Sequence, residues 1–385
     1  MKDVQLILGE LGKKANARTR EIMIAKRNGK KVVEYFGDFV PEQWIWAAGA
    51  EPYLICKGGD PQAPEATQQY MLRFMNPLSS SLAGNYLRGM DQVMENADTI
   101  VVQQHDGHYG RATEILEFKG LQVYKVGVPA DYTSGISGGY YRNELKELRA
   151  HLESVVGAPI NDDEIRKNYE KTNKINALLR RINEMRKREN PPITFGDFIR
   201  LNHYTLRLDY DTSIEALERL CELLENAEGA YKSGSPRVLI MGRAVAEGDY
   251  SVPDLVENSG GMIVTEFLDE CIRPYNCSID TQGDVTEAYA KAIYDEKMPP
   301  CIFQPSWEKR YEHLLELAKD YKVDGIILYQ LAFDEIYDME FATVQKHLDE
   351  AGIPALKLES SYEYQRESMG PLTTRIESYI ESLRR

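Results

Sequence analysis

The stretch TIVVQQHDGHYGRATEILEFKGLQVYKVGVP, residues 99–129, decides the fold. Its two apolar segments, 99–103 and 121–129, are rich in β-branched residues and are typical of buried strands. Between them, RATEILEFKG (111–120) has the pattern of a helix. Because a crossover helix lets the second strand run parallel to the first, the stretch predicts a β-α-β unit in a parallel sheet.

The alternation of strand and helix extends upstream of this unit. A charged amphipathic helix (1–30) precedes a strand at 30–36, and a helix that starts at Pro41 leads to a second strand at 53–56. A helical pattern then runs from about 66 to 96. This order favours a mostly parallel sheet with helices on both faces.

The middle of the chain has a different character, because its patterns are all helical up to about residue 235. Strands resume at PRVLIMGRAV, 236–245, and alternate with helices to the closing TTRIESYIESLRR. We therefore predict an α/β fold: two Rossmann-like domains with parallel sheets, plus a helical section between them. The expected divisions are 1–140 (the first α/β domain with the N-terminal helix), 141–235 (the helical section) and 236–385 (the second α/β domain with the C-terminal helix).

Charge and composition limit the partners. The 385 residues include 46 Lys and Arg against 61 Asp and Glu, a net charge of -15, which disfavours nucleic acid and anionic membranes. No segment approaches the roughly 20 apolar residues of a membrane span, and the N-terminal segment lacks a secretory apolar core, so we expect a cytoplasmic protein. The five cysteines show no C-x-x-C spacing, which argues against a zinc ribbon or a disulfide framework.

Candidate ligand loops are those that follow strands, because ligands of such sheets bind beyond the carboxyl ends of the strands. The loop QHDGHYG contributes His105, Asp106 and His108. These side chains could bind a metal or act as hydrogen-bonded loop residues, and Gly107 predicts that they lie in a loop, not on a helix. The glycine-bearing loops at 58–60 and 242–248 could cradle phosphates or simply mark turns.

Several longer segments resemble one known family. They are YFGDFVPEQWIWAAGAEPYLIC, GVPADYTSGISGGYYRNELKELRAHLE, INDDEIRKNYEKTNKINALLRRI, KVDGIILYQLAFDEIYDMEFATVQKHLDEAGIPALKLE and TTRIESYIESL. In this order and spacing they are similar to the 2-hydroxyacyl-CoA dehydratase and benzoyl-CoA reductase family, in particular to 2-hydroxyglutaryl-CoA dehydratase beta-subunit-like members. The resemblance covers nearly the whole chain.

The resemblance implies an oxygen-sensitive enzyme of anaerobic metabolism. Two similar subunits form a heterodimer that holds 4Fe-4S clusters, and a separate ATP-dependent iron-sulfur activator delivers one electron at low potential. In the dehydratases this electron converts the acyl-CoA thioester to a ketyl radical, from which hydroxide leaves carbon 2. In the reductases the same low-potential electron transfer reduces an aromatic ring.

The resemblance also implies where cluster cysteines would lie. The three positions carry Asn76, His105 and Phe333 in this chain. Because clusters are held by cysteine thiolates, this set cannot hold a cubane. We therefore expect no cluster bound by this chain and a 4Fe-4S cluster in the partner subunit.

Three hypotheses remain. In the first, the chain is the cluster-free subunit of an ATP-activated (R)-2-hydroxyacyl-CoA dehydratase or benzoyl-CoA-reductase-like enzyme, with His105, Asp106 and His108 in hydrogen bonding or proton transfer. Its substrate-binding candidates for acyl-CoA are Arg111, Arg243 and Glu42. In the second, it is a non-catalytic binding or regulatory paralogue that kept the fold and lost the redox site. The third is a mononuclear metal site built from the same two histidines and aspartate.

Overall fold

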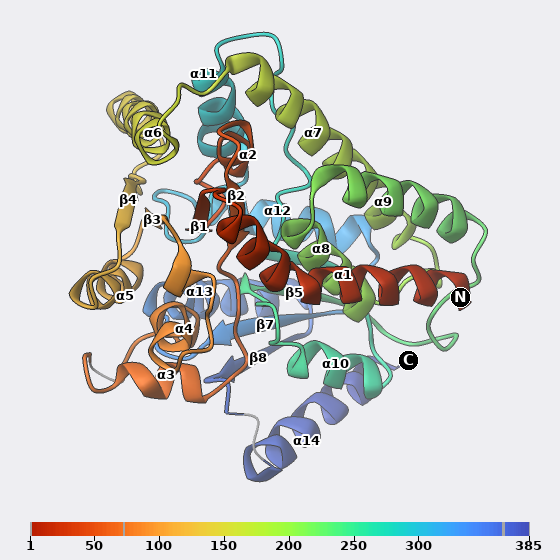
Figure 1. Cartoon of the computed structure of the whole chain (residues 1–385). Helices are drawn as coiled ribbons and strands as arrows, with labels where there is room; N and C mark the ends of the chain where they lie inside the picture. The colour runs from red at the N-terminus through yellow and green to blue at the C-terminus, as the bar shows by residue number, and fades with distance from the viewer. Residues whose placement is uncertain (1, 72–73, 364–365, 385) are drawn as a thin grey trace.

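The computed structural model describes residues 2–71, 74–363 and 366–384 (Figure 1). Two four-stranded sheets, both fully parallel, form in this part of the chain, with strand orders β2-β1-β3-β4 and β6-β5-β7-β8. The strands are β1 Val32–Phe36, β2 Glu51–Leu54, β3 Thr99–Gln104, β4 Val123–Gly127, β5 Arg237–Ala244, β6 Met262–Glu270, β7 Gly325–Leu331 and β8 Ala355–Ser360. The predicted α/β class with two Rossmann-like sheets is confirmed.

Helices connect and cover these strands. Around the first sheet lie α1 Lys2–Arg27, α2 Glu42–Ala47, α3 Gln62–Thr67, α4 Pro77–Leu87, the short 3-10 helix η1 Met94–Asn96, α5 Gly107–Phe118 and α6 Gly135–Val156. The next three are α7 Asp162–Met185, α8 Phe195–Arg207 and α9 Tyr210–Glu225. With the second sheet come α10 Ser251–Asn258, α12 Trp307–Asp320, α13 Glu335–Ala351 and α14 Arg366–Leu383. Between α10 and α12 in the chain, α11 Val285–Ala290 and the π-helix η2 Lys291–Glu296 pack in the core of the first sheet with α2, α6 and α7. Among the described residues, none of these helices combines the length and apolar character needed to cross a bilayer.

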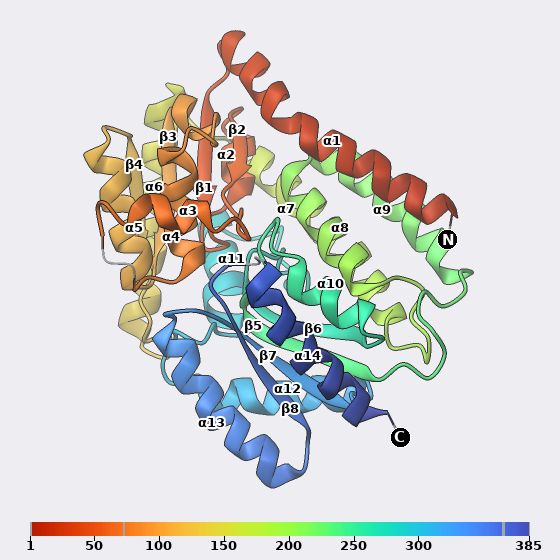
Figure 2. The same cartoon turned by 90° about the horizontal axis from the view of Figure 1, so that it is seen from below.

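The second sheet is covered on both faces by helices, as Figure 2 shows from below. Its strands alternate their side chains between the two faces, so neighbouring residues enter different cores. Ile327 and Tyr329 of β7 belong to the core with α10 and α14, whereas Ile326 and Leu328 pack in the core with α12 and α13. Burial on both faces explains why the sequence of β7 reads as a continuous apolar run.

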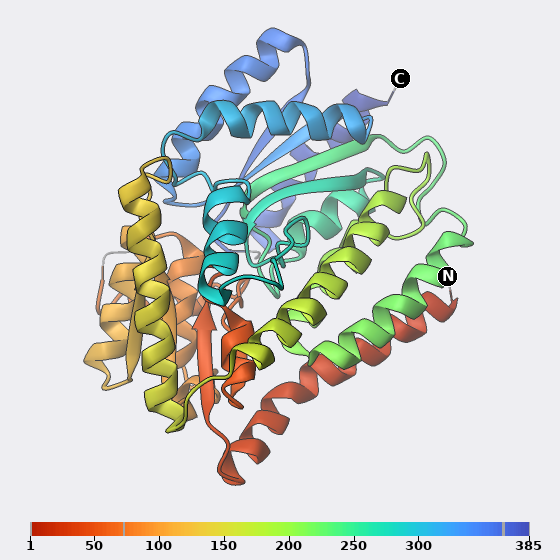
Figure 3. The same ribbon diagram turned by 90° about the horizontal axis from the view of Figure 1, so that it is seen from above.

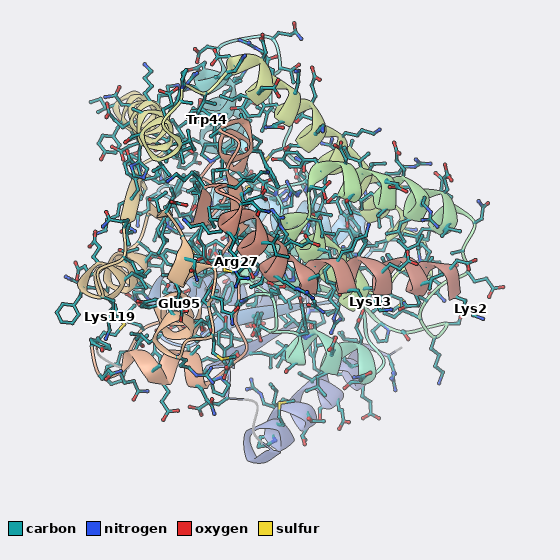
Figure 4. The ribbon with its side chains drawn as sticks, viewed as in Figure 1. Lys2, Lys13, Arg27, Trp44, Glu95 and Lys119 are labelled. Atoms are coloured by element: carbon teal, nitrogen blue, oxygen red, sulfur yellow. The ribbon has the colours of Figure 1, made fainter. Side chains whose placement is uncertain are left out.

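The helical section packs against α1, not only against the sheets. Apolar residues of α1 such as Leu8 and Leu11 share a core with Leu217 and Leu220 of α9. Figure 3 shows α1 and α9 side by side, next to α7. Polar side chains cover the outer face, and Figure 4 shows Lys2 at the far end of α1. The N-terminal helix therefore connects the first sheet to the helical section.

Helix α2 joins the helical section to the first sheet through a buried aromatic pair. Trp44, labelled in Figure 4, is fully buried and donates its indole N–H to the hydroxyl of Tyr169 on α7 at 2.7 Å. Tyr169 in turn donates to the carbonyl of Val285 at 2.8 Å. A buried indole N–H needs such an acceptor, and here the chain of bonds fixes three segments together.

The start of α5 corrects one prediction. The sequence predicts that Gly107 keeps the histidines in a loop, but α5 begins at Gly107 and includes His108. Asp106 has an extended backbone with φ of -141°, and its Oδ1 accepts from the backbone N–H of Tyr109 at 2.9 Å. A side-chain N-cap of this kind stabilises a helix by about 1 kcal/mol, which offsets the cost of one glycine in the first turn.

The two sheets face each other through the glycine-bearing loops. Lys57 and Glu247 form a parallel bridge between them, with Gly58 N–H donating to Glu247 O at 3.0 Å and Glu247 N–H donating to Cys56 O at 2.8 Å. A Cβ on Gly59 would lie 2.6 Å from the carbonyl oxygen of Gly248. The glycines therefore serve the close approach of two backbones, and the loops hold the carboxyl ends of the sheets together.

Candidate functional site

A buried polar cluster fills the space where the carboxyl ends of the two sheets meet. Arg243, near the end of β5, donates to Asp334 Oδ2 at 2.6 Å and to Asp106 Oδ2 at 2.8 Å. Its Nη1 also lies 3.5 Å from Glu270 Oε1 at the end of β6. The side chains of this cluster, all buried, form what we call the Arg243 network: His105, Asp106, Tyr109, Arg243, Glu270 and Asp334.

His105 connects the first sheet to Glu270 of the second. Its Nε2 lies 2.7 Å from Glu270 Oε1, which fixes the proton on Nε2 when Glu270 is ionised. The phenol of Tyr109 donates to the other oxygen of Glu270, and the Tyr109 ring stacks on the His105 ring at 5.4 Å with an interplanar angle of 1°. The His105 Nδ1 atom is buried and has no hydrogen-bond partner among the described residues.

The pKa values of the three carboxylates in the network are shifted in different directions. Burial alone would raise the pKa of Asp106, but Arg243 and His105 hold it at about 2. Burial opposes ionisation of Glu270 as well, yet Arg243 and His105 leave the pKa of Glu270 below its usual value. For Asp334 burial prevails over Arg243, and its pKa is raised. Asp106 is therefore a fixed negative charge at neutral pH and not a proton carrier.

His108 takes part in a separate, partly exposed set of contacts. Its Nδ1 accepts the backbone N–H of Asn76 at 3.1 Å, so the ring proton resides on Nε2. That Nε2 lies 3.5 Å from Glu335 Oε2 at the start of α13. His108 thus joins α5 to the cap of α4 and approaches Glu335, which is not part of the Arg243 network.

The three positions at which the resemblance places cluster ligands are occupied by other interactions. Asn76 caps α4, with Oδ1 accepting Ser79 N–H at 2.8 Å, while His105 is bound to Glu270. Phe333 has a left-handed backbone with φ of 60°, and its ring is 44% exposed and meets Phe74 at 5.4 Å. These residues offer no thiolate, so a 4Fe-4S cluster does not fit them.

A mononuclear metal site is not assembled either. In the parts of the chain that the structure describes, no three His, Cys, Asp or Glu side chains are grouped as metal ligands. The cysteines do not supply such a group, and burial raises the pKa of Cys56 to about 12 and that of Cys277 to about 11. Thiols in these surroundings remain protonated and unreactive at neutral pH.

A cavity of about 60 Å³ lies next to the Arg243 network, beside Cys271. Glu42, at the start of α2, lines it and pairs with Arg273 at 2.9 Å, and it accepts from the Tyr35 hydroxyl at 2.7 Å. The cavity is lined by Tyr35, Phe36, Gly37, Asp38, Val40, Glu42, Gln43, Leu54, Ile55, Cys56, Thr172, Asn176, Leu206, Cys271, Ile272, Arg273, Pro274, Cys277, Ile279, Tyr289 and Ile293. The first sheet, α7 and the segment that follows β6 contribute to its wall.

A second and larger cavity, of about 430 Å³, lies beside the edge strand β6. It shares Asp38, Arg273 and Cys277 with the small cavity, so the two spaces lie against a common wall. Lys297 follows the π-helix η2 and forms an ion pair with Asp38 at this wall.

The structure separates the predicted site residues into different places. His105, Asp106 and Arg243 meet in the Arg243 network, Glu42 lines the inner cavity, and Arg111 lies on the exposed face of α5, paired with Glu114 at 2.6 Å. Each of the three guanidinium nitrogens of Arg243 donates to a carboxylate of the protein. Arg243 therefore positions the network and does not face a CoA phosphate.

Sequence reasoning missed several members of the site, which in chain order are Tyr109, Glu270, Arg273 and Asp334. The signal for Glu270 and Asp334 was their position at the carboxyl ends of β6 and β7, where loops carry ligands. Nothing local to Tyr109 indicates its bond to Glu270, 161 residues away.

Together the fold and the site define a class of protein: two parallel-sheet domains that meet at the carboxyl ends of their strands, with a ligand-sized space between them. Within that class, the chain belongs to the family of the 2-hydroxyglutaryl-CoA dehydratase D-component, whose family model matches residues 39–383. The predicted family is thereby confirmed.

Individual relatives have modest identity over most of both chains. The dehydratase-like protein YjiM of Escherichia coli (strain K12) is 24% identical over 368 residues, 94% of this chain and 94% of that one. One of the subunits of the benzoyl-CoA reductase of Thauera aromatica is 24% identical over 362 residues, 92% of this chain and 91% of that one. The beta subunit of the (R)-2-hydroxyglutaryl-CoA dehydratase of Acidaminococcus fermentans is 22% identical over 370 residues, covering 93% and 94%.

Proposed function

We propose that this chain is the cluster-free subunit of an ATP-activated acyl-CoA dehydratase or reductase. A homologous subunit with cluster cysteines is its partner in a heterodimer and holds the 4Fe-4S cluster, and an ATP-dependent iron-sulfur activator supplies the electron. Support comes from the family membership and from relatives whose names describe subunits of such enzymes.

One observation carries the proposal. Two of the three positions where cluster ligands are expected are held by internal hydrogen bonds, His105 by Glu270 at 2.7 Å and Asn76 as the cap of α4. The chain also has two adjoining cavities of about 60 and 430 Å³. Loss of ligands together with retention of ligand-sized space favours a role in substrate binding without electron storage.

The chain's own residues would hold and surround the acyl-CoA. The inner cavity has mostly apolar walls, so it removes water from the reacting end of the substrate. Glu42 is held rigidly by Arg273 and Tyr35 and fixes one side of that cavity. His105 is the member of the Arg243 network whose second ring nitrogen remains unpartnered among the described residues, so it is the candidate for moving a proton.

The experiment is anaerobic co-expression with a homologous cysteine-bearing subunit, followed by native purification and analysis of iron, sulfide and subunit ratio. We expect a one-to-one complex in which iron is unchanged by His105→Gln or Asn76→Ser in this chain and is lost when the partner's cluster cysteines are replaced. Iron that disappears with His105→Gln would contradict the cluster-free assignment.

A second candidate function is a non-catalytic binding or regulatory paralogue. The observation that favours it is the near-complete pairing of the Arg243 network, in which the charged side chains are engaged with one another. In that case the chain purifies alone or as a homodimer, without iron, and acyl-CoA turnover in the presence of the activator does not depend on it. Dependence of turnover on this chain would exclude this candidate.

A further inference from the structure

Arg273 is a buried arginine that lines both cavities. It lies shortly after the end of β6, its side chain is 3% exposed, and it forms part of the wall that the inner cavity shares with the larger one. Burial opposes its charge, but the carboxylate of Glu42 outweighs burial, so the pKa of Arg273 is raised above its usual value. A permanently charged donor group therefore stands where the two cavities adjoin.

The protein uses only part of the hydrogen-bonding capacity of this guanidinium. Nη1 donates to Glu42 Oε1 at 2.9 Å, Nε to Thr205 Oγ1 at 3.2 Å and Nη2 to the Thr205 carbonyl at 2.7 Å. Each of the two terminal nitrogens carries a second N–H group. In residues 2–71, 74–363 and 366–384, no acceptor is bonded to these second N–H groups. Two charged donors are therefore available to a ligand at the shared wall.

The guanidinium is held in place from two helices. The backbone N–H of Arg273 donates to Asn202 Oδ1 at 2.8 Å, so both its main chain and its side chain are bonded to α8. Glu42, at the start of α2, is itself fixed by the hydroxyl of Tyr35 at 2.7 Å. Donors that are fixed before a ligand arrives lose little freedom on binding, so each bond they form contributes more to affinity.

Such donors suit an oxygen acceptor. The N–H groups of a guanidinium lie in one plane and match the lone pairs of a carbonyl or a carboxylate. Leu54, Leu206 and Ile293 line the inner cavity with Arg273, and apolar surroundings strengthen a charge-assisted hydrogen bond. Under the proposed function the ligand is an acyl-CoA, which has a carbonyl oxygen beside its sulfur whatever the acyl group is.

We propose that Arg273 binds the carbonyl oxygen of an acyl thioester in the inner cavity. This inference rests on the proposed function, which supplies the thioester. In that reaction one electron from an iron-sulfur donor is added to the carbonyl, no bond breaks in this step, and negative charge develops on the oxygen. The N–H groups of Arg273 stabilise that charge, and the guanidinium stays protonated. Arg273 thus binds substrate in addition to linking α2 to α8.

The test compares three coenzyme A derivatives on the full chain by isothermal titration calorimetry. Butyryl-CoA carries the thioester carbonyl, S-butyl-CoA has a methylene in its place, and S-(3-carboxypropyl)-CoA has a terminal carboxylate but no carbonyl beside sulfur. We expect butyryl-CoA to bind about tenfold or more tightly than S-butyl-CoA, because the thioether loses a hydrogen bond to a charged group. Equal binding of these two, no binding of butyryl-CoA, or a preference for the carboxylate derivative alone would overturn the proposal.

Variants assign the preference to one side chain. Arg273→Lys keeps a positive charge beside Glu42 but loses the planar donors, so it should abolish the preference for butyryl-CoA and leave the affinity for S-butyl-CoA unchanged. The matched control is Arg18→Lys, because Arg18 is also buried, pairs with Glu51 at 2.6 Å and lines neither cavity. The control should keep the full preference. A preference that survives Arg273→Lys would mean that another group binds the carbonyl.

A measurement on the wild type decides if Arg273→Lys does not fold. Infrared difference spectra of bound butyryl-CoA, with and without an isotope label at the carbonyl carbon, isolate the carbonyl stretch. We expect this stretch at a lower frequency than in water, because charged donors weaken the carbonyl bond more than water does. A higher frequency than in water would show an apolar site without donors, in which Arg273 has a structural role only.

The outcome is separable from that of the proposed function. A preference for butyryl-CoA that depends on Arg273, in a chain that never joins a cysteine-bearing subunit, would leave the thioester site intact and refute the subunit role. Conversely, a one-to-one iron-bearing complex that binds butyryl-CoA and S-butyl-CoA alike would support the subunit role and refute the thioester site.

Discussion

Replacing Arg243 by methionine should destabilise the folded chain far more than replacing Arg111 by methionine. Arg243 is 3% exposed and donates to carboxylates from three separate segments, whereas the Arg111 side chain is 68% exposed and pairs with its helix neighbour Glu114. A unit charge pair about 4 Å apart is worth roughly 4 kcal/mol at an effective dielectric constant of about 20. Removing one partner of a buried pair costs about 3–5 kcal/mol, and an exposed pair contributes about 0–1 kcal/mol.

Urea unfolding at neutral pH, followed by circular dichroism, measures both losses. We expect a decrease of about 4 kcal/mol in the free energy of unfolding for Arg243→Met and less than about 1 kcal/mol for Arg111→Met. The first value is a large part of the roughly 5–15 kcal/mol that typically stabilises a folded domain. If the two variants differ by less than about 1 kcal/mol, the Arg243 network does not hold the sheets together and the reasoning fails.

The pH dependence of that loss gives an independent check. In the wild type the pKa of Asp106 is about 2 and that of Glu270 is lowered, because Arg243 and His105 outweigh their burial. Lowered carboxyl pKa values contribute stability above the unfolded pKa of about 4, and this contribution is lost as the pH falls through the folded values. The difference between wild type and Arg243→Met should therefore be largest above about pH 5 and shrink towards about pH 3.

Three further predictions concern other buried positions. Gly84→Ala should lower the free energy of unfolding by several kcal/mol, because the added Cβ would lie 1.9 Å from the carbonyl oxygen of Ala63. Gly139→Ala in α6 meets open space and should raise that free energy by about 0.5–1 kcal/mol. Thermal melting of the two variants measures both effects. Burial lowers the pKa of His203 to about 4, so the free energy of unfolding should fall by about 3 kcal/mol between about pH 6.5 and pH 4. His203→Asn should remove this fall when urea unfolding is measured across that pH range. Burial and Asp91 raise the pKa of Glu34, so the stability that the protonated Glu34 contributes is lost as the pH rises. Glu34→Gln should therefore increase the free energy of unfolding at pH 7 by about 1–3 kcal/mol. A decrease in that free energy would refute this.

The sequence was sufficient for the fold because the central strands are buried on both faces and the connections between strands are helical. The run at 325–331 reads as apolar throughout, and the structure places its alternating residues in two different cores. It also placed His105 and Asp106 at the end of one strand and Arg243 at the end of another, but it did not predict that the two sheets bring them together. Local patterns carry the positions of the strands, so no long-range pairing had to be known for these.

Long-range pairings account for what the sequence did not predict. Glu270 receives bonds from His105 and Tyr109, which lie 165 and 161 residues away, and no local pattern links them. The predicted loop at Gly107 was wrong for a local reason, since the cap by Asp106 outweighs the low helix propensity of glycine. The two cavities were invisible for a third reason: they depend on how side chains from both sheets fail to fill a shared space.

The Arg243 network explains how the carboxyl ends of the two sheets can meet although several carboxylates lie there. Asp106 belongs to the first sheet's loop, whereas Glu270 and Asp334 follow strands of the second, so these carboxylates would repel one another across the junction if no cation lay between them. One buried guanidinium bonds to all three and thereby makes their approach favourable. Such a junction carries fixed charge but stores no electron. Under the proposed function, such a chain shapes a substrate cavity and leaves the electron chemistry to its partner subunit.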